Sequence, residues 1–327
     1  MRCMPVLSLR VLIALLIVAG SAACKSLVPT RIRVLVIANS DVRDIPLAMA
    51  ADDLRNQGYR VEITPMMSGA LMADALSRGD AELASFNNET LWAAIGKGLR
   101  AKTIVQRLSF PNLVVTRQSV SCRAMNGRPL AIGSQTGLNP RLVSRYFESR
   151  CPGTEPQVLV IPDSAARTAA LVGGTVDAAL LPLEEFLKLQ KAAPGTYATL
   201  VDLTKEFPQL QVNAVQARGD WLEQHPREVR EVIRALLLVH RRIIANRRLL
   251  YTRTLEQLKT DKAETTSVID ALIAAGAWDP NGALTNDNVQ YTLNFLQETG
   301  AVPKGLRVED VADLAPLNDV LNDIGRQ

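Results

Sequence analysis

A strand-and-helix pattern recurs along the sequence at a constant spacing of 95 residues. The apolar run at 33–38 (RVLVIA) has its counterpart at 128–133 (RPLAIG), and both runs lead into polar residues. The clearest match is the pattern A-L-x-x-G-x-x-acid-x-A, which occupies 75–84 and again 170–179. A looser match at the same spacing joins two further apolar runs, 61–66 and 156–161. Three matches at a constant spacing predict that two stretches of the chain fold with the same order of strands and helices.

Each stretch is expected to form a βαβαβ unit. In the clearest match, Ala-Leu closes a helix, Gly79 or Gly174 supplies a left-handed cap, and a short buried strand follows the acidic residue. Apolar strands that alternate with amphipathic helices are typical of a parallel α/β sheet. We therefore predict an α/β fold with two βαβ-type lobes, a hinge, a cleft between the lobes and extra C-terminal helices. Ligands of open α/β sheets bind beyond the carboxyl ends of the strands, so the loops there are expected to line the cleft.

Two extended segments, 109–116 and 210–216, are the candidate crossings between the lobes. They predict a discontinuous first lobe, 31–115 plus 213–327, with the second lobe, 116–212, inserted into it. The candidate hinge residues lie on or beside the crossings: Asn112, Thr116 and Asn213. After the return the pattern is helical, and we expect one helix from Pro226 and two more that pack on the first lobe, over 262–275 and 286–299.

Residues 1–23 have the form of a secretory signal peptide. Arg2 and Arg10 precede an apolar run that is too short for a spanning helix, and small residues follow it. Cys24 comes next and resembles the lipidated cysteine of a bacterial lipobox, although ordinary signal peptidase would cut the same bond and leave a free thiol. We expect a tether over 24–30 and a lipid-anchored protein in the periplasm or at the cell surface, with a soluble periplasmic protein as the alternative.

Cys122 and Cys151 remain as an even pair once Cys3 is removed with the signal and Cys24 is acylated. In an oxidising compartment such a pair is expected to form a disulfide. Two separate buried thiols are the alternative, because the sequence does not fix the distance between them.

Composition excludes several classes of protein. The formal charge is +4, but without residues 1–23 it falls to +2, and the chain has only three Trp, five Tyr and six Phe. A nearly neutral chain without a basic aromatic motif disfavours nucleic-acid binding. Only His225 and His240 are present, and no zinc, serine-hydrolase, dinucleotide or P-loop motif occurs. We expect neither a metal nor a cofactor.

The sequence resembles a known family over roughly residues 31–260: the type 2 periplasmic solute-binding proteins of ABC importers, in the nitrate, sulfonate, taurine and thiamine-precursor group. The segments that carry the resemblance are 58–62, 75–82, 93–99, 126–133, 165–171 and 221–229. The resemblance implies a periplasmic binding protein-like fold, capture of a small solute between hinged lobes, and delivery to a membrane permease with its ATPase. We expect a monomeric binding protein that is not an enzyme.

Polar residues at the strand ends are the candidate ligand contacts. In the first lobe they are Asn39, Ser40, Ser68, Gly69, Ser85, Asn87 and Asn88, and in the second Ser134, Gln135, Thr136, Gly137, Asp163 and Ser164. Helix N-termini present free N–H groups and partial positive charge, which suits an anion or a polar head group. The same residue types are ordinary helix N-caps. Arg43, Arg141 and Arg167 are candidate charge partners, and the sequence does not single one out.

Two other functions remain open on the same fold. An extracellular sensor or scaffold would hand its ligand to a signalling partner rather than to a permease. An enzyme similar to those that make the thiamine pyrimidine is less favoured, because those relatives are cytoplasmic and use a histidine-rich site.

Overall fold

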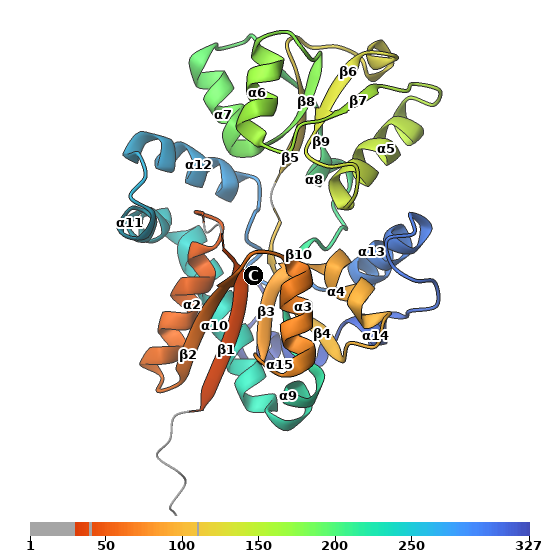
Figure 1. Cartoon of the computed structure of the whole chain (residues 1–327). Helices are drawn as coiled ribbons and strands as arrows, with labels where there is room; N and C mark the ends of the chain where they lie inside the picture. Colours follow the sequence, from red (N-terminus) through yellow and green to blue (C-terminus); the bar gives the residue numbers. More distant parts are fainter. Residues whose placement is uncertain (1–29, 39–40, 110) are drawn as a thin grey trace, which may run out of the picture.

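The computed structural model describes residues 30–38, 41–109 and 111–327. The predicted signal peptide, Cys24, Asn39 and Ser40 lie outside the described residues. The chain forms two five-stranded sheets flanked by helices, one above the other (Figure 1), which confirms the predicted α/β fold with two lobes.

The first sheet has the strand order β2-β1-β3-β10-β4. Strands β1 and β2 pair in parallel, as do β1 and β3, whereas β10 runs antiparallel to both of its neighbours. Its strands are β1 (Arg31–Ile37), β2 (Arg60–Met66), β3 (Leu83–Asn87), β4 (Ala101–Leu108) and β10 (Asn213–Arg218). The helices between them are α2 (Ile45–Asn56), α3 (Gly69–Arg78) and α4 (Asn88–Ile95).

The second sheet has the order β7-β6-β8-β5-β9. Its strands are β5 (Asn112–Thr116), β6 (Pro129–Ile132), β7 (Gln157–Val160), β8 (Ala178–Pro182) and β9 (Ala198–Asp202). Its helical segments are η1 (Cys122–Met125), α5 (Leu138–Arg150), α6 (Ser164–Val172), α7 (Leu183–Ala192) and the short α8 (Leu203–Glu206).

The two sheets correspond strand by strand, and the repeat predicts the three parallel strands of each. The bounds of β3 and β8 differ by the repeat spacing of 95 at both ends, and Gly79 and Gly174 both adopt the left-handed conformation, with φ of 78° and 75°. Glycine suits these positions because a side chain is strained there. The fourth strand of each sheet is antiparallel and adjoins a crossing, β10 in the first sheet and β5 in the second.

The crossings are shorter than the sequence indicates. The predicted boundary between 115 and 116 falls inside β5, whose residues all pair within the second sheet, so the outward crossing lies before Asn112. The predicted hinge residue Thr116 is buried at the far end of β5, where its hydroxyl donates to the carbonyl of Gln118 at 2.7 Å. Asn112 and Asn213 begin the two strands that adjoin the crossings.

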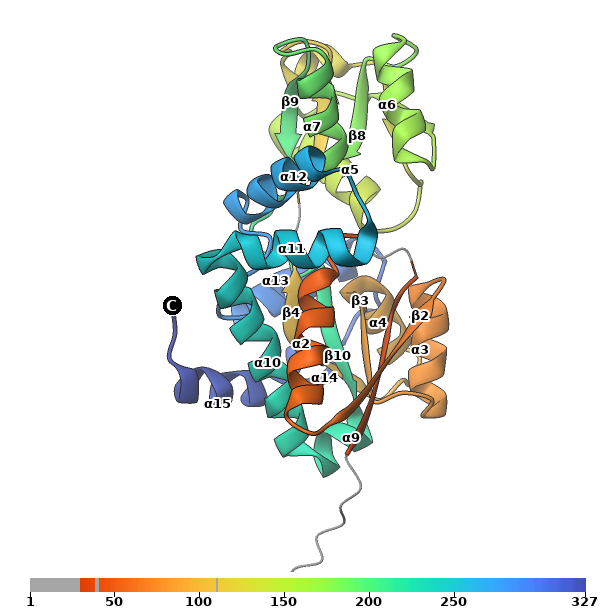
Figure 2. The same cartoon turned by 90° about the vertical axis from the view of Figure 1, so that its left-hand side faces the viewer.

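The C-terminal helices contact both lobes. They are α9 (Gly219–Gln224), α10 (Pro226–Ala245), α11 (Arg247–Leu258), α12 (Lys262–Ala274), α13 (Asn286–Glu298), α14 (Val308–Val311) and α15 (Ala315–Ile324). Helix α10 packs on α2 in the first lobe, whereas α12 packs on α11 and on α7 of the second lobe (Figure 2). The Nζ of Lys188 in α7 lies 3.4 Å from Oε1 of Glu264 in α12. Helix α12 therefore contacts the second lobe in addition to its packing on α11.

A disulfide joins Cys122 at the start of η1 to Cys151 at the end of α5, with the Cα atoms 6.2 Å apart. The bond closes a loop across a sequence separation of 29 residues. In the chain-entropy account, closure of such a loop contributes about 3–4 kcal/mol to the stability of the second lobe.

His240 is fully buried on α10. Its Nδ1 lies 2.9 Å from the carbonyl oxygen of Asp279, so Nδ1 carries the proton and donates. Among the described residues, Nε2 has no hydrogen-bond partner. Burial is the main cause that lowers the pKa of His240 to about 4, although the bond to Asp279 acts in the opposite direction.

The low pKa predicts acid destabilisation through His240. In the unfolded chain the imidazole takes up its proton near pH 6.5, before the folded protein does, so stability present above that pH is lost as the pH falls toward 4. Between pH 7 and 4.5 we expect His240 to account for about 2–3 kcal/mol of lost unfolding free energy. Urea titrations of His240→Asn should show a correspondingly flatter pH dependence than the wild type. His225→Asn is the control, and an equal effect of both substitutions would contradict the prediction.

Candidate functional site

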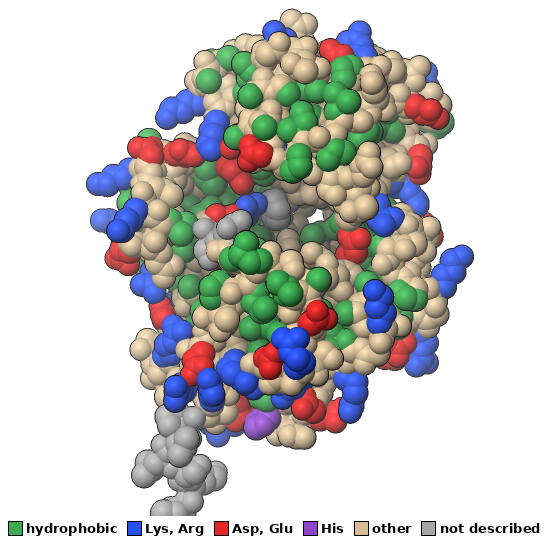
Figure 3. All heavy atoms as spheres, viewed as in Figure 1, with side chains coloured by type: hydrophobic (Ala, Val, Ile, Leu, Met, Phe, Trp, Pro, Cys, Tyr) green, Lys and Arg blue, Asp and Glu red, His purple; other side chains and the backbone are tan. Residues whose placement is uncertain are grey.

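A cavity of about 710 Å³ lies between the two lobes. Figure 3 shows the surface hollowed there, between the upper and the lower lobe. Both sheets contribute residues from the ends of strands and the starts of helices, and the segment after α13 contributes Gly300 and Ala301. The cavity therefore lies where open α/β sheets bind their ligands.

The cavity brings together some of the predicted contacts and not others. Those that line it are Asn87, Ser134, Thr136 and Gly137, and the two candidate hinge residues Asn112 and Asn213 line it as well. Those that the structure places outside its lining are Ser68, Gly69, Ser85, Asn88, Gln135, Asp163 and Ser164.

Several of the residues outside the lining have structural roles. Ser68 and Asp163 are N-caps, whose side chains accept from the N–H groups of Leu71 at 3.3 Å and Ala166 at 2.7 Å. A Cβ on Gly69 would lie 3.0 Å from the ring of Phe86, so glycine there allows α3 to pack closely on β3. The capping alternative therefore explains Ser68 and Asp163.

Asn88 belongs to a buried hydrogen-bond network. Its Nδ2 donates to the carbonyl of Gln211 at 3.1 Å, and its Oδ1 accepts from the hydroxyl of Thr103 at 2.9 Å. The indole of Trp92 donates to the same hydroxyl at 3.1 Å. The network ties α4 and β4 to the return crossing. Ser85 is buried as well, and its Oγ has no hydrogen-bond partner among the described residues.

In the lower lobe, Asn87 and Asn213 are paired in register across β3 and β10. The Oδ1 of Asn87 accepts from the N–H of Thr90 at 2.8 Å and caps α4. Its amide nitrogen has no partner within the described part of the chain, so the side chain caps the helix and also presents a donor to the cavity. Capping and ligand contact are compatible at this position.

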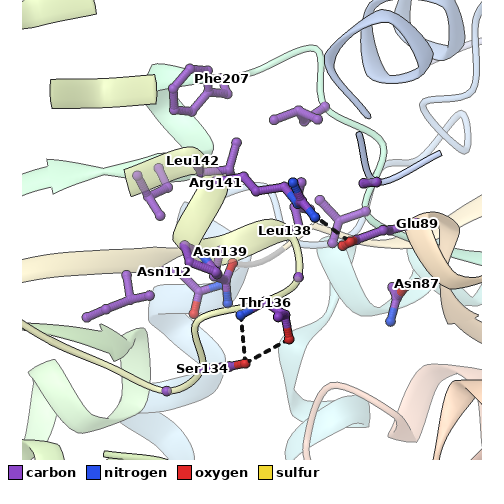
Figure 4. A pocket seen from close by; sticks show the side chains of 18 of the residues that line it. Asn87, Glu89, Asn112, Ser134, Thr136, Leu138, Asn139, Arg141, Leu142 and Phe207 are labelled. Carbon is purple, nitrogen blue, oxygen red and sulfur yellow. Dashed lines mark hydrogen bonds and ion pairs between the residues drawn. The ribbon is translucent and has the colours of Figure 1, made fainter. Parts of the chain in front are cut away.

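In the upper lobe, the loop from β6 to α5 faces the cavity. The Oγ of Ser134 accepts from the N–H of Thr136 at 3.1 Å, and the two hydroxyls lie 3.3 Å apart (Figure 4). Gly137 is the N-cap of α5, with a φ of 96°, and carries no side chain that could cap the helix. The start of α5 thus presents backbone N–H groups toward the cavity.

Arg167 of α6 lines the cavity and is only 8% exposed. Three backbone carbonyls hold it: Nε donates to Leu180 at 2.7 Å, and Nη1 donates to Ile161 and Pro162 at 2.8 Å each. No carboxylate of the described residues forms an ion pair with it, and Nη2 has no partner among them. Burial lowers the pKa of Arg167, yet an arginine keeps its charge. Arg167 is therefore a fixed cation beside the cavity.

The other two candidate arginines have carboxylate neighbours. Arg43 pairs with Asp41 and lies 3.5 Å from Glu184, away from the cavity lining. Arg141 lines the cavity, and its Nε lies 3.8 Å from Oε1 of Glu89 (Figure 4). Burial raises the pKa of Glu89, whereas Arg141 and a hydrogen bond from the backbone of Leu138 act against that increase.

Sequence reasoning did not identify Glu89 as a cavity residue. It also missed the apolar wall that Leu203, Phe207 and Leu210 form near the return crossing. Glu89 lies in the first turn of α4, where an acidic residue is ordinarily explained by its favourable interaction with the positive end of the helix dipole. Only the approach of the two lobes shows that its side chain faces α5.

Residues 49–246, from α2 to the end of α10, match the family described as NMT1/THI5 like. The chain belongs to the NMT1/THI5-like family. This confirms the resemblance to the nitrate, sulfonate and thiamine-precursor group, and the matched region spans both lobes. No curated protein sequence matches the chain.

Solved structures show where the NMT1/THI5-like fold recurs. The periplasmic aliphatic sulphonate-binding protein SsuA from Escherichia coli matches with a TM-score of 0.69 at 16% identity, over 88% of this chain and 92% of that one. The periplasmic nitrate-binding protein NrtA from Synechocystis PCC 6803 matches with 0.65 at 14% identity, over 91% and 89%. A mutant of DszB, in complex with biphenyl-2-sulfinic acid, matches with 0.62 at 14% identity, over 90% and 100%.

The described residues of this NMT1/THI5-like chain also bear on metal binding and on membrane insertion. Residues 30–38, 41–109 and 111–327 contain no group of three or more His, Cys, Asp or Glu side chains that could hold a metal ion. Over the same ranges, no helix is sufficiently long and apolar to span a bilayer.

Proposed function

We propose that the protein is an exported receptor that captures a small polar or anionic solute between its lobes and delivers it to an ABC import permease. The observation that carries the proposal is the interlobe cavity, lined by strand ends, helix starts and the buried cation Arg167. The folds shared with a sulphonate-binding and a nitrate-binding protein support it. Sulfonates, taurine, nitrate and thiamine precursors are the proposed solute classes.

In this proposal Arg167 contacts the anionic group of the solute. Its guanidinium is held in place by three carbonyls, so little side-chain entropy remains to be lost on binding. A Cβ on residue 133 would lie 3.0 Å from Nη1, and glycine there leaves room beside the guanidinium. The amide of Asn87 and the start of α5 supply further donors.

Closure of the lobes about the two crossings is the proposed mechanism, with Asn112 and Asn213 next to the points that bend. The lining groups that can contact a polar solute are hydroxyls, amides, two guanidiniums and a carboxylate, which bind through hydrogen bonds and charge. We further propose a periplasmic monomer anchored through a lipid on Cys24, with a soluble periplasmic form as the alternative.

Mass spectrometry of solute released from gently purified protein tests this function. We expect a small polar or anionic compound that is recovered unchanged and that raises the melting temperature when it is added back. Recovery of a chemically altered compound would indicate an enzyme instead. A protein that no sulfonate, carboxylate, nitrate or pyrimidine stabilises would contradict the receptor function.

A further inference from the structure

The carboxylate of Glu89 reaches across the cavity to the opposite lobe. Glu89 belongs to α4 in the lower lobe, and the backbone N–H of Leu138, the first residue of α5 in the upper lobe, lies close enough to act against the rise of the Glu89 pKa. Its Oε2 lies 4.0 Å from the position that a Cβ on Gly137 would take. Figure 4 shows the side chain directed at Arg141 from the other side of the cavity. Glu89 therefore lies beside the start of a helix that belongs to the other lobe.

The position that Glu89 occupies has the chemistry of an anion site. Helix α5 begins at Gly137 without a side-chain cap of its own, and the carboxylate from α4 lies beside this uncapped start. Arg141 stands one turn into the same helix and donates through Nη1 to the carbonyl of Thr299. Its Nε is buried without a hydrogen-bond partner among the described residues, and Glu89 at 3.8 Å is its carboxylate neighbour. A second cation, the buried Arg167, lines the same cavity.

We propose that Glu89 is an internal competitor for the anionic group of the solute and thereby sets how tightly this protein holds anions. The inference rests on the proposed function. When the carboxylate is ionised, it neutralises Arg141 and fills the start of α5, so an incoming anion must displace it. Protonation removes the competing charge. The burial that raises the pKa of Glu89 brings that protonation closer to neutral pH, and the charge of Arg141 acts in the opposite direction.

Titration calorimetry with methanesulfonate tests the proposal, because this anion keeps its charge across the pH range used. We expect Glu89→Gln to bind it about tenfold more tightly than the wild type at pH 7.5, since a neutral amide does not compete for the cation. The wild-type affinity should rise from pH 7.5 to pH 5, whereas that of Glu89→Gln should stay constant. Glu184→Gln is the matched control, because Glu184 also lies near an arginine of the other lobe, Arg43, but outside this cavity.

Melting temperatures establish that each variant is folded, and Glu89→Ala provides a second test should the amide disturb α5. Equal or weaker binding by both Glu89 variants would overturn the inference and leave the receptor function intact. The inference would also be overturned, and the receptor function kept, if the wild type bound another solute but no variant bound methanesulfonate. Turnover of a solute would instead contradict the proposed function.

Discussion

Replacement of Arg167 by lysine is expected to weaken the binding of an anionic solute at least about a hundredfold, which corresponds to about 3 kcal/mol. Lysine keeps the positive charge, but it cannot hold three carbonyls and still present a second nitrogen to the cavity. The loss should appear in calorimetric titrations with the solute recovered from the native protein. The melting temperature should fall as well, because Leu180, Ile161 and Pro162 lose donors.

Arg117→Lys separates these two effects. Arg117 also donates from its guanidinium to backbone carbonyls of the second lobe, those of Leu171 and Val172, but it does not line the cavity. The two substitutions should therefore both affect stability, whereas only Arg167→Lys should reduce affinity. Similar affinity losses in the two variants would show that Arg167 acts through folding alone.

Replacement of Asn88 by leucine should cost about 3 kcal/mol of unfolding free energy. Leucine has nearly the same shape, but it leaves the buried carbonyl of Gln211 without its donor and the hydroxyl proton of Thr103 without its acceptor. Urea denaturation measures the change. Solute affinity of the folded protein should remain near that of the wild type, because Asn88 does not line the cavity.

Asn87→Ser is the companion variant. Serine retains a side-chain oxygen for the N–H of Thr90, so α4 keeps its cap, but the amide that faces the cavity is lost. We expect nearly unchanged stability and weaker solute binding. If Asn88→Leu instead lowered affinity at full stability, the buried network would have to be reinterpreted as part of the binding site.

The fold was predictable because its two halves repeat a local pattern. The left-handed glycines at 79 and 174, and the strands that follow them, are set by nearest neighbours in sequence and appear where the repeat places them. The pairing of β5 and β10 was harder to predict, since an extended crossing does not indicate which sheet it joins. Thr116 was assigned to the hinge for that reason, although it lies inside the second sheet.

The site was predictable only in part, because a strand-end serine or aspartate has the same sequence signature whether it caps a helix or contacts a ligand. Ser68 and Asp163 show the first outcome, and Asn87 shows that both can coincide. Arg167 could be named from the sequence but not preferred over Arg43, whose carboxylate partners become evident only in three dimensions. Glu89 depends on the approach of two lobes, and no local pattern encodes it.

The position of β10 in the sequence also bears on the order in which the two sheets are completed during synthesis. As the chain emerges from its N-terminus, β9 finishes the second sheet at Asp202, whereas the first sheet lacks its antiparallel strand until β10 ends at Arg218. Leu108 and Asn213 are register partners, so the ends left by the inserted lobe lie side by side. Folding of the inserted lobe therefore brings the ends of β4 and β10 together and lowers the entropic cost of adding β10 to the first sheet.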